Sequence, residues 1–240
     1  MQVLSEIIIW VFILVFGASF GAFANVLIHR IPRNLSTIFP NSFCPECATP
    51  LFWSDKIPLF SFLILRAKCR HCQKRIPTFY FLSEFFGAVL ALFCYFLATP
   101  SALALFFLIL CFYILSIIDA HFLAIPDSLN FLTLALSLIV AFLNNTFLIS
   151  CITALSFIGF ATFLRLFVSF LMGKEALGEG DLLLFGTISC TLGAFYGAIA
   201  IFLAALHALA FLMLGRKSDT IPFVPFLFLG FLSAFLWQIV

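Results

Sequence analysis

The stretch LLLFGTISCTLGAFYGAIAIFLAALHALAFLML, residues 182–214, decides the fold class of this chain. It runs for 33 residues without a single Asp, Glu, Lys or Arg. As one helix it would be about 50 Å long, whereas the hydrocarbon core of a bilayer is about 30 Å thick. Gly193 and Gly197 offer a place to break it. We therefore expect two membrane helices here, near 182–193 and 195–214, of which the first is short.

The rest of the chain has the same character. Of its 240 residues, 65% are hydrophobic and 9% are charged, and the mean hydropathy is +1.25. A soluble domain carries about a quarter of its residues charged. The sequence therefore predicts an all-α polytopic membrane protein. Further apolar runs predict spans near 5–28, 79–98, 101–118, 128–143, 147–170 and 222–239, which makes about eight transmembrane helices.

The distribution of charge orients these spans. The first apolar run carries its positive charges after it, whereas a cleaved signal peptide carries them before, so we expect a retained helix with its N-terminus outside. If successive spans cross the membrane in alternating directions, most Lys and Arg lie on one side. The positive-inside rule assigns that side to the cytoplasm. That side holds the segments 29–78, 119–127 and 171–181 and the pair Arg216–Lys217. No basic stripe with interleaved aromatics suggests a nucleic-acid partner.

Three parts are expected: a first transmembrane helix (1–28), a small cytoplasmic insertion (29–78) and a membrane core (79–240). The insertion is too short to rely on a hydrophobic core alone. It contains two C-x2-C pairs, and four thiolates give Zn²⁺ a closed tetrahedral site. The ligands would be Cys44, Cys47, Cys69 and Cys72. Disulfides are disfavoured in the cytoplasm, so we predict structural zinc; a redox dithiol and four unlinked cysteines are the alternatives.

Acidic residues gather in two loops on the same side, Asp119 and Asp127 in IIDAHFLAIPD and Glu175, Glu179 and Asp181 in GKEALGEGD. Asp127 follows a proline and opens an apolar helix, so a role as N-cap explains it. Asp181 also opens a helix, and a cap and a functional carboxylate remain equally open. Asp119 ends a helix, where the macrodipole disfavours a carboxylate. It is a candidate functional group, with a solvated loop residue as the alternative.

Two neighbouring carboxylates cannot both ionise comfortably, so one keeps a proton while the other activates water. Hydrolysis of a peptide bond by aspartates requires this division of roles. Gly178 and Gly180 flank Glu179 and would let the backbone bend and approach a substrate chain. Spacing alone does not show that Asp119 and Asp181 meet.

Six ordered blocks together resemble the type IV prepilin peptidases, which are membrane aspartyl proteases of the GxGD type. They are GAFANVLIHRIP (21–32), the double C-x2-C block with DKIPLFSFL inside it, RIPTFYFLSEFFG (75–87), IIDAHFLAIPD (117–127), GKEALGEGD (173–181) and IPFVPFLFLG (221–230). The chain departs from the family pattern at Ala176 and Val224, where glycine is usual, and at Glu179, where an aromatic residue is frequent.

The resemblance implies an endopeptidase of the bacterial inner membrane, with its active site facing the cytoplasm and 79–240 as the protease core. Its substrates would be prepilins or pseudopilins, cut after a glycine, and many members then N-methylate the new terminus with S-adenosylmethionine. Asp119 and Asp181 would be the catalytic pair, and Cys44, Cys47, Cys69 and Cys72 the zinc ligands. Asn25, His29 and Arg30 lie in the first block, where helix-end anchors are an equal interpretation.

Two other functional classes stay open at this stage. A transporter with Asp119 as an ion or proton site would place acids near the middle of a span, whereas these lie at span ends. A membrane-tethered zinc-binding docking protein without peptidase activity leaves Asp119 unexplained.

Overall fold

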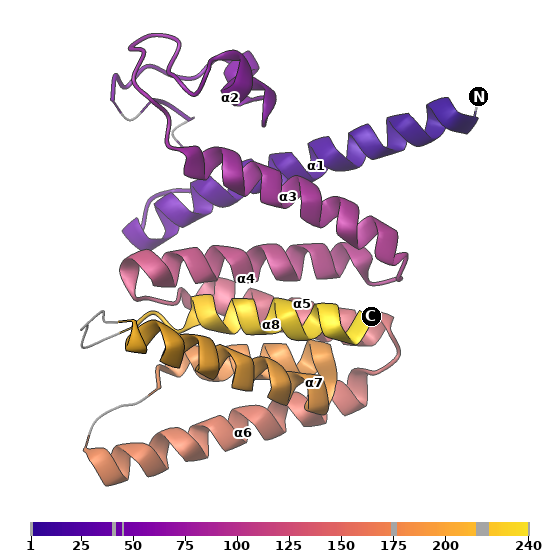
Figure 1. Cartoon of the computed structure of the whole chain (residues 1–240), viewed down its shortest axis with the longest axis vertical. Coiled ribbons are helices and arrows are strands. Elements are labelled where there is room, and N and C mark those ends of the chain that lie inside the picture. The colour runs from indigo at the N-terminus through magenta and orange to yellow at the C-terminus, as the bar shows by residue number, and fades with distance from the viewer. Residues whose placement is uncertain (1, 40–41, 45, 174–176, 215–220, 240) are drawn as a thin grey trace. The chain divides into compact units, whose positions relative to one another are not determined.

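The computed structural model describes residues 2–39, 42–44, 46–173, 177–214 and 221–239. It is helical, and among the described residues the only extended pairing consists of two isolated bridges, Phe43 with Pro50 and Lys68 with Arg75. The chain forms two compact units, Met1–Ala102 and Leu103–Val240 (Figure 1). The predicted all-α fold class is confirmed.

The first unit is built on two long helices, α1 (Gln2–Arg30) and α3 (Thr78–Leu97), which cross each other (Figure 1). Small residues let them approach closely. A Cβ added to Gly17 would lie 2.3 Å from the Gly87 carbonyl oxygen, and one added to Gly21 would lie 2.3 Å from the Ser83 carbonyl oxygen. Gly17 and Gly21 are spaced as in the GxxxG pattern, by which membrane helices pack without a hydrophobic driving force. Glycine is therefore required at this crossing.

Between these helices the chain forms the short elements η1 (Ile31–Arg33), η2 (Trp53–Lys56) and α2 (Phe60–Ile64). The segment is fixed to α3 at two points. The Leu59 backbone N–H donates to Glu84 Oε2 at 2.7 Å, and the rings of Phe62 and Phe81 lie 5.1 Å apart. The insertion is thus attached to the helix that follows it.

The second unit contains α4 (Ala102–Phe122), α5 (Asp127–Leu143), α6 (Phe147–Met172), α7 (Glu179–Met213) and α8 (Val224–Ile239). Helix α4 packs against α8 through aromatic rings, since Phe112 lies 5.5 Å from Phe228 and 5.6 Å from Phe231. Large apolar side chains of α6 remain exposed, including Phe160, Phe163 and Phe170, as expected of a surface that faces lipid.

Helix α7 is two helices joined at a sharp bend. Gly193 has φ 78° and ψ 176°, a conformation that residues with a Cβ rarely adopt. A Cβ on Gly197 would lie 3.0 Å from Ser189 Cα, although eight residues of straight helix would separate the two by about 12 Å. The chain therefore folds back on itself, and the predicted break in 182–214 is confirmed at Gly193.

Within the described residues, five helices, α1, α3, α4, α6 and α7, are long and apolar enough to cross a membrane, while α5 and α8 are shorter apolar helices. Counting the two halves of α7 separately, these are the eight apolar helical segments that the sequence predicted. Bounds differ from the predictions by a few residues, most at the end of α4, which runs on to Phe122 and so includes Asp119.

Candidate functional site

Asp119 lies in the last turn of α4 and is only 6% exposed. Its Oδ2 accepts a hydrogen bond of 3.0 Å from the backbone N–H of Val224. Val224 is the first residue of α8, and the N-terminus of a helix favours a negative charge. The favourable interaction of the Asp119 carboxylate with the N-terminus of α8 therefore offsets its unfavourable interaction with the C-terminal end of α4. A solvated loop residue, the alternative considered for Asp119, does not fit this burial.

The contact from α8 also explains why one departure from the family pattern is tolerable. The donor to Asp119 is the backbone N–H of Val224, one of the three departures from the resemblance named in the sequence analysis. Any residue except proline supplies that N–H, so the side chain of Val224 is not needed for the hydrogen bond.

Asp181 lies in the first turn of α7 and is 7% exposed. Its Oδ2 accepts a hydrogen bond of 3.2 Å from the backbone N–H of Gly178, the N-cap residue of α7. Its Oδ1 is buried and has no hydrogen-bond partner among the described residues. Oδ2 of Asp181 thus caps the helix, as the simpler interpretation predicted, and Oδ1 remains available for a further hydrogen bond.

Contacts between three segments bring Asp181 to the end of α4. The side-chain amide of Asn130, on α5, donates to the Gly180 carbonyl at 2.8 Å. A Cβ on Gly180 would lie 2.7 Å from Ile125 Cδ1, so the start of α7 packs directly on the loop between α4 and α5. Asp119 lies close enough to Asp181 for their negative charges to interact. The two loops predicted to share one side therefore meet at one end of this unit.

The glycines of GEGD have a different role from the one predicted. Gly178 has φ −69° and ψ 151°, and Gly180 is helical, so neither position requires the conformational freedom of glycine. Both positions instead have little room for a side chain. A side chain at Gly180 would collide with Ile125, and a Cβ on Gly178 would lie 3.1 Å from Asp181 Oδ2. The predicted bending is wrong, because neither glycine has a backbone conformation that needs it and both instead make room around Asp181. The predicted approach to a substrate chain stays a prediction.

Sequence reasoning missed Asn130. It is fully buried, its Nδ2 holds the start of α7, and its Oδ1 has no hydrogen-bond partner among the described residues. A buried amide oxygen left without a donor is costly, so this atom is a ready acceptor for a water or a substrate N–H. An amide side chain one turn inside the apolar helix after IPD is the signal that could have identified it.

The other acidic residues lie around this pair. Asp127 is exposed and occupies the first helical position of α5, with Pro126 as N-cap, so its prediction as the N-cap residue is wrong by one position. Its charge still favours the N-terminus of that helix. Glu179 is largely exposed and pairs with Arg165 of α6 at 3.0 Å. Glu175 lies outside the described residues.

The four predicted metal ligands converge. The ligand atoms of Cys44, Cys47, Cys69 and Cys72 all lie within 4.8 Å of one another, with 3.9 Å between the sulfurs of Cys44 and Cys72 and 4.0 Å between those of Cys47 and Cys69. Sulfurs at the corners of a zinc tetrahedron, with Zn–S bonds of about 2.3 Å, lie about 3.8 Å apart. The described thiols therefore fit zinc closely.

Both C-x2-C pairs form the same local structure. In the first, the Ala48 N–H donates to the Cys44 carbonyl at 2.9 Å and the Cys44 N–H donates to the Thr49 carbonyl at 3.0 Å. In the second, Gln73 and Lys74 make the same two contacts with Cys69, at 3.1 and 2.9 Å. Ala48 and Gln73, which follow the second cysteine of each pair, both have left-handed φ values, 55° and 58°. We call these two hairpins, 43–50 and 68–75, the zinc knuckles.

Ion pairs connect the parts of this segment, and its thiols differ in how readily they ionise. Lys74 pairs with Glu46 across the two knuckles, and Arg70 pairs with Asp55 at 2.6 Å. Hydrogen bonds from Thr49 lower the pKa of Cys47 to about 6, and backbone hydrogen bonds from Cys72 and His71 lower the pKa of Cys69. A backbone hydrogen bond from Lys74 lowers the pKa of Cys72, but desolvation and the neighbouring thiols outweigh it and raise that pKa to about 11. Thiolate is the form that binds metal.

The residues of the first block are anchors at the end of α1. Arg30 Nη1 donates to the Ser36 carbonyl at 2.9 Å, and the His29 carbonyl accepts from Arg33 at 2.6 Å. Asn25 differs, because it is buried, its Nδ2 donates to the Tyr80 carbonyl at 3.3 Å, and its Oδ1 has no hydrogen-bond partner among the described residues. Of the three, Asn25 is the one with a buried polar atom that lacks a hydrogen-bond partner among the described residues.

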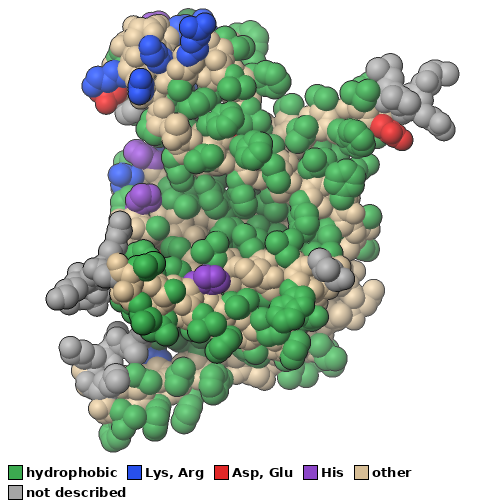
Figure 2. Space-filling model, viewed as in Figure 1, with side chains coloured by type: hydrophobic (Ala, Val, Ile, Leu, Met, Phe, Trp, Pro, Cys, Tyr) green, Lys and Arg blue, Asp and Glu red, His purple; other side chains and the backbone are tan. Residues whose placement is uncertain are grey.

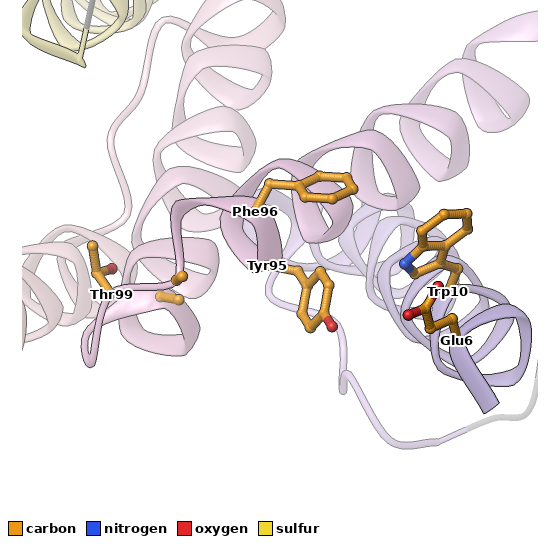
Figure 3. Close-up of a pocket in the computed structure, with 7 residues that line it drawn as sticks. Glu6, Trp10, Tyr95, Phe96 and Thr99 are labelled. Carbon is orange, nitrogen blue, oxygen red and sulfur yellow. The ribbon is translucent and has the colours of Figure 1, made fainter. Parts of the chain in front are cut away.

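The N-terminal part of α1 and the C-terminal end of α3 form an open depression (Figure 3). None of the predicted site residues lines it. Glu6 and Trp10 project into it from α1, and Tyr95, Phe96 and Thr99 from α3 and the turn after it. Trp and Tyr are enriched where membrane spans leave the bilayer. This depression therefore marks the far end of the two spans from the zinc knuckles.

Comparisons with known proteins divide the chain in the same place as its contacts do. Residues 15–98 match the model of the bacterial peptidase A24 N-terminal domain, and residues 104–213 match that of the type IV leader peptidase family. The four cysteines fall in the first match, and Asp119 and Asp181 fall in the second. None of the solved structures matches the chain.

Several curated proteins are similar over most of their length. A prepilin leader peptidase/N-methyltransferase of Klebsiella pneumoniae is 34% identical over 192 residues, covering 76% of this chain and 84% of the relative. One of Bacillus subtilis is 32% identical over 244 residues, covering 93% and 92%. A type 4 prepilin-like proteins leader peptide-processing enzyme of Escherichia coli is 30% identical over 239 residues, covering 89% and 88%.

The two family models together match most of the chain, and these relatives are similar over at least 76% of it. The chain belongs to the type IV leader peptidase family.

Proposed function

We propose that this protein is a membrane aspartic endopeptidase that removes the leader from type IV prepilins or type II secretion pseudopilins, with Asp119 and Asp181 as its catalytic pair. The observation that carries the proposal is that two buried carboxyls, each held by a backbone N–H at the start of a helix, lie close enough for their charges to interact. Family membership supports the reaction and the substrate class. It also disfavours a transporter and a docking protein without activity.

The chemistry needs one proton shared between the two carboxyls. The ionised group takes a proton from water, whose oxygen attacks the carbonyl carbon of the scissile bond. The protonated group donates its proton to the departing nitrogen, and the bond between carbon and nitrogen breaks. A carboxylic acid on the leader and a free amine on the mature protein result, and the proton of the pair ends on the other carboxyl. Burial keeps the pair away from bulk water, which strengthens the interaction between the two groups.

The four cysteines would hold a structural Zn²⁺. The sulfur separations fit a closed tetrahedral site, and four thiolates leave no open position for catalysis by the metal. Its function would be to stabilise a segment too small for a core of its own.

N-methylation of the new terminus, with S-adenosylmethionine as the methyl donor, forms the second part of the proposal. The names of the relatives support it. We assign no residue to this step.

We further propose the bacterial inner membrane as the location, with the catalytic pair facing the cytoplasm. The concentration of Lys and Arg in segment 29–78 supports this orientation. Reporter fusions after Arg75 and Lys174 should then report the cytoplasm, and fusions after Thr99 and Asn145 the outside.

The decisive experiment is incubation of the purified full-length protein with a peptide that spans a prepilin leader and the first residues of the mature chain. Mass measurement should find the mature peptide cut after the glycine, and in the presence of S-adenosylmethionine its mass should increase by one methyl group. An intact peptide would contradict the protease assignment. A cut but unmethylated peptide would contradict only the second activity.

A further inference from the structure

The apolar side of α2 is the feature that the proposed function leaves unexplained. Phe60, Leu63 and Ile64 are 59%, 62% and 76% exposed, and Trp53 in the preceding turn is 79% exposed. Soluble surfaces rarely expose such a contiguous apolar patch, and one of this kind marks an interaction site. The question is what covers it.

The depth of α2 points to lipid. Helix α3 has 20 residues, so it is about 30 Å long and has little length to spare in crossing the hydrocarbon core. Helix α2 contacts α3 at Phe81 and Glu84, which lie about 5 and 9 Å along the helix from Thr78. Amphipathic helices that rest on a membrane lie about 5–10 Å into the boundary between headgroups and acyl chains. Helix α2 is therefore attached to α3 at the level of that boundary.

The charge beside the patch is positive. Segment 29–78 carries eight Lys and Arg against two acids. Both acids are paired within the segment, Glu46 with Lys74 and Asp55 with Arg70. Lys56, Arg66 and Lys68, the cations nearest to α2 in sequence, are exposed and form no ion pair with a described residue. Figure 2 shows basic side chains gathered over this segment, with hydrophobic side chains beside them.

We propose that α2 and the turn before it form an interfacial membrane anchor that binds anionic lipid. The apolar side chains enter the acyl boundary, and the three unpaired cations contact acidic headgroups. This inference depends on the membrane fold and not on the proposed peptidase activity.

A fluorescence experiment on the full-length protein tests the proposal. Trp10, Trp53 and Trp237 are replaced by Phe, and Ile64→Trp places a single probe on α2, where a larger side chain has room. Glu46→Trp in the same background is the control, on an exposed position of the first zinc knuckle. Both proteins are placed in phosphatidylcholine vesicles with and without about one third phosphatidylglycerol. Phe60→Trp replaces the probe if the first variant lacks zinc or fails to fold.

Brominated acyl chains should quench the probe at position 64, and acrylamide in the water should quench it at least about threefold less than the control. Phosphatidylglycerol should increase the quenching by lipid, and Arg66→Glu with Lys68→Glu should abolish that increase. A probe quenched by acrylamide as readily as the control would overturn the anchor. Protection from both quenchers would mean that protein covers α2, and lipid quenching independent of phosphatidylglycerol would overturn the role of the cations.

Discussion

The two candidate sites are held together in opposite ways. Each zinc knuckle closes through hydrogen bonds between residues four or five apart, and the two are joined by the cysteines themselves. The aspartate pair depends on contacts between distant parts of the chain, since Val224 is 105 positions from Asp119 and Gly180 is 50 positions from Asn130. The metal site should therefore tolerate changes elsewhere in the chain, whereas the aspartate pair should respond to any change that moves one helix against another.

The largest expected effect comes from the aspartates. Asp119→Asn and Asp181→Asn keep the size of the side chain and remove its charge, so each should lower cleavage of a prepilin peptide by at least about 10²–10⁴-fold. Zinc content should not change, because neither residue belongs to the metal site. Cleavage near the wild-type rate in either variant would show that the pair is assigned wrongly.

The next effect concerns the metal. Wild-type protein should contain about one Zn²⁺ per chain, and Cys69→Ser should lose it, because a hydroxyl does not replace a thiolate ligand. Elemental analysis measures the metal, and limited proteolysis of residues 42–78 measures whether the segment stays folded. Cys94→Ser is the matched control, since Cys94 is buried in α3 away from the ligands. A folded segment without metal in the wild-type protein would contradict the prediction.

Close packing at Gly180 provides a more selective test of whether the aspartate pair depends on contacts between helices and the metal site does not. Gly180→Ala should collide with Ile125 and cost about 1–3 kcal/mol, which corresponds to about a tenfold or greater loss of cleavage if the strain displaces Asp181. Ile125→Ala removes the atoms that collide, so the double variant should recover part of the lost activity. Zinc content should be normal in all three. Equal losses in Gly180→Ala and in the double variant would mean that this contact does not position Asp181.

Substitution of Asn130 should lower cleavage less than substitution of either catalytic aspartate and more than substitution of Asp127. Asn130→Ala leaves the buried Gly180 carbonyl without its donor, at a cost of about 1–3 kcal/mol. Asn130→Gln retains the amide and should recover more cleavage than Asn130→Ala. The value of kcat should fall more than KM rises, since the displaced group is Asp181. A change confined to KM would instead place Asn130 in substrate binding.

The same contrast explains what the sequence could predict. The apolar helices, the break at Gly193 and the cluster of four cysteines follow from periodicity, chain length and the spacing of cysteines, all of which are local properties. The contact of Val224 with Asp119, the role of Asn130 and the steric role of Gly180 depend on which helices become neighbours. The sequence alone does not contain that information in a local pattern, which is why the glycines were predicted to supply bending and Asn130 was missed.

Asp127 should show the smallest effect. It is exposed and has no hydrogen-bonding role as a cap, so its charge contributes only the interaction with the N-terminus of α5, about 0.3–1 kcal/mol. Asp127→Asn should therefore retain cleavage within about twofold and change the melting temperature by no more than a few degrees. Asp127 lies only eight positions from Asp119 along the chain, yet the two should differ in effect by orders of magnitude, because burial and partners separate them. A loss from Asp127→Asn as large as that from Asp119→Asn would place a third carboxylate in the reaction and break the assignment of a two-aspartate site.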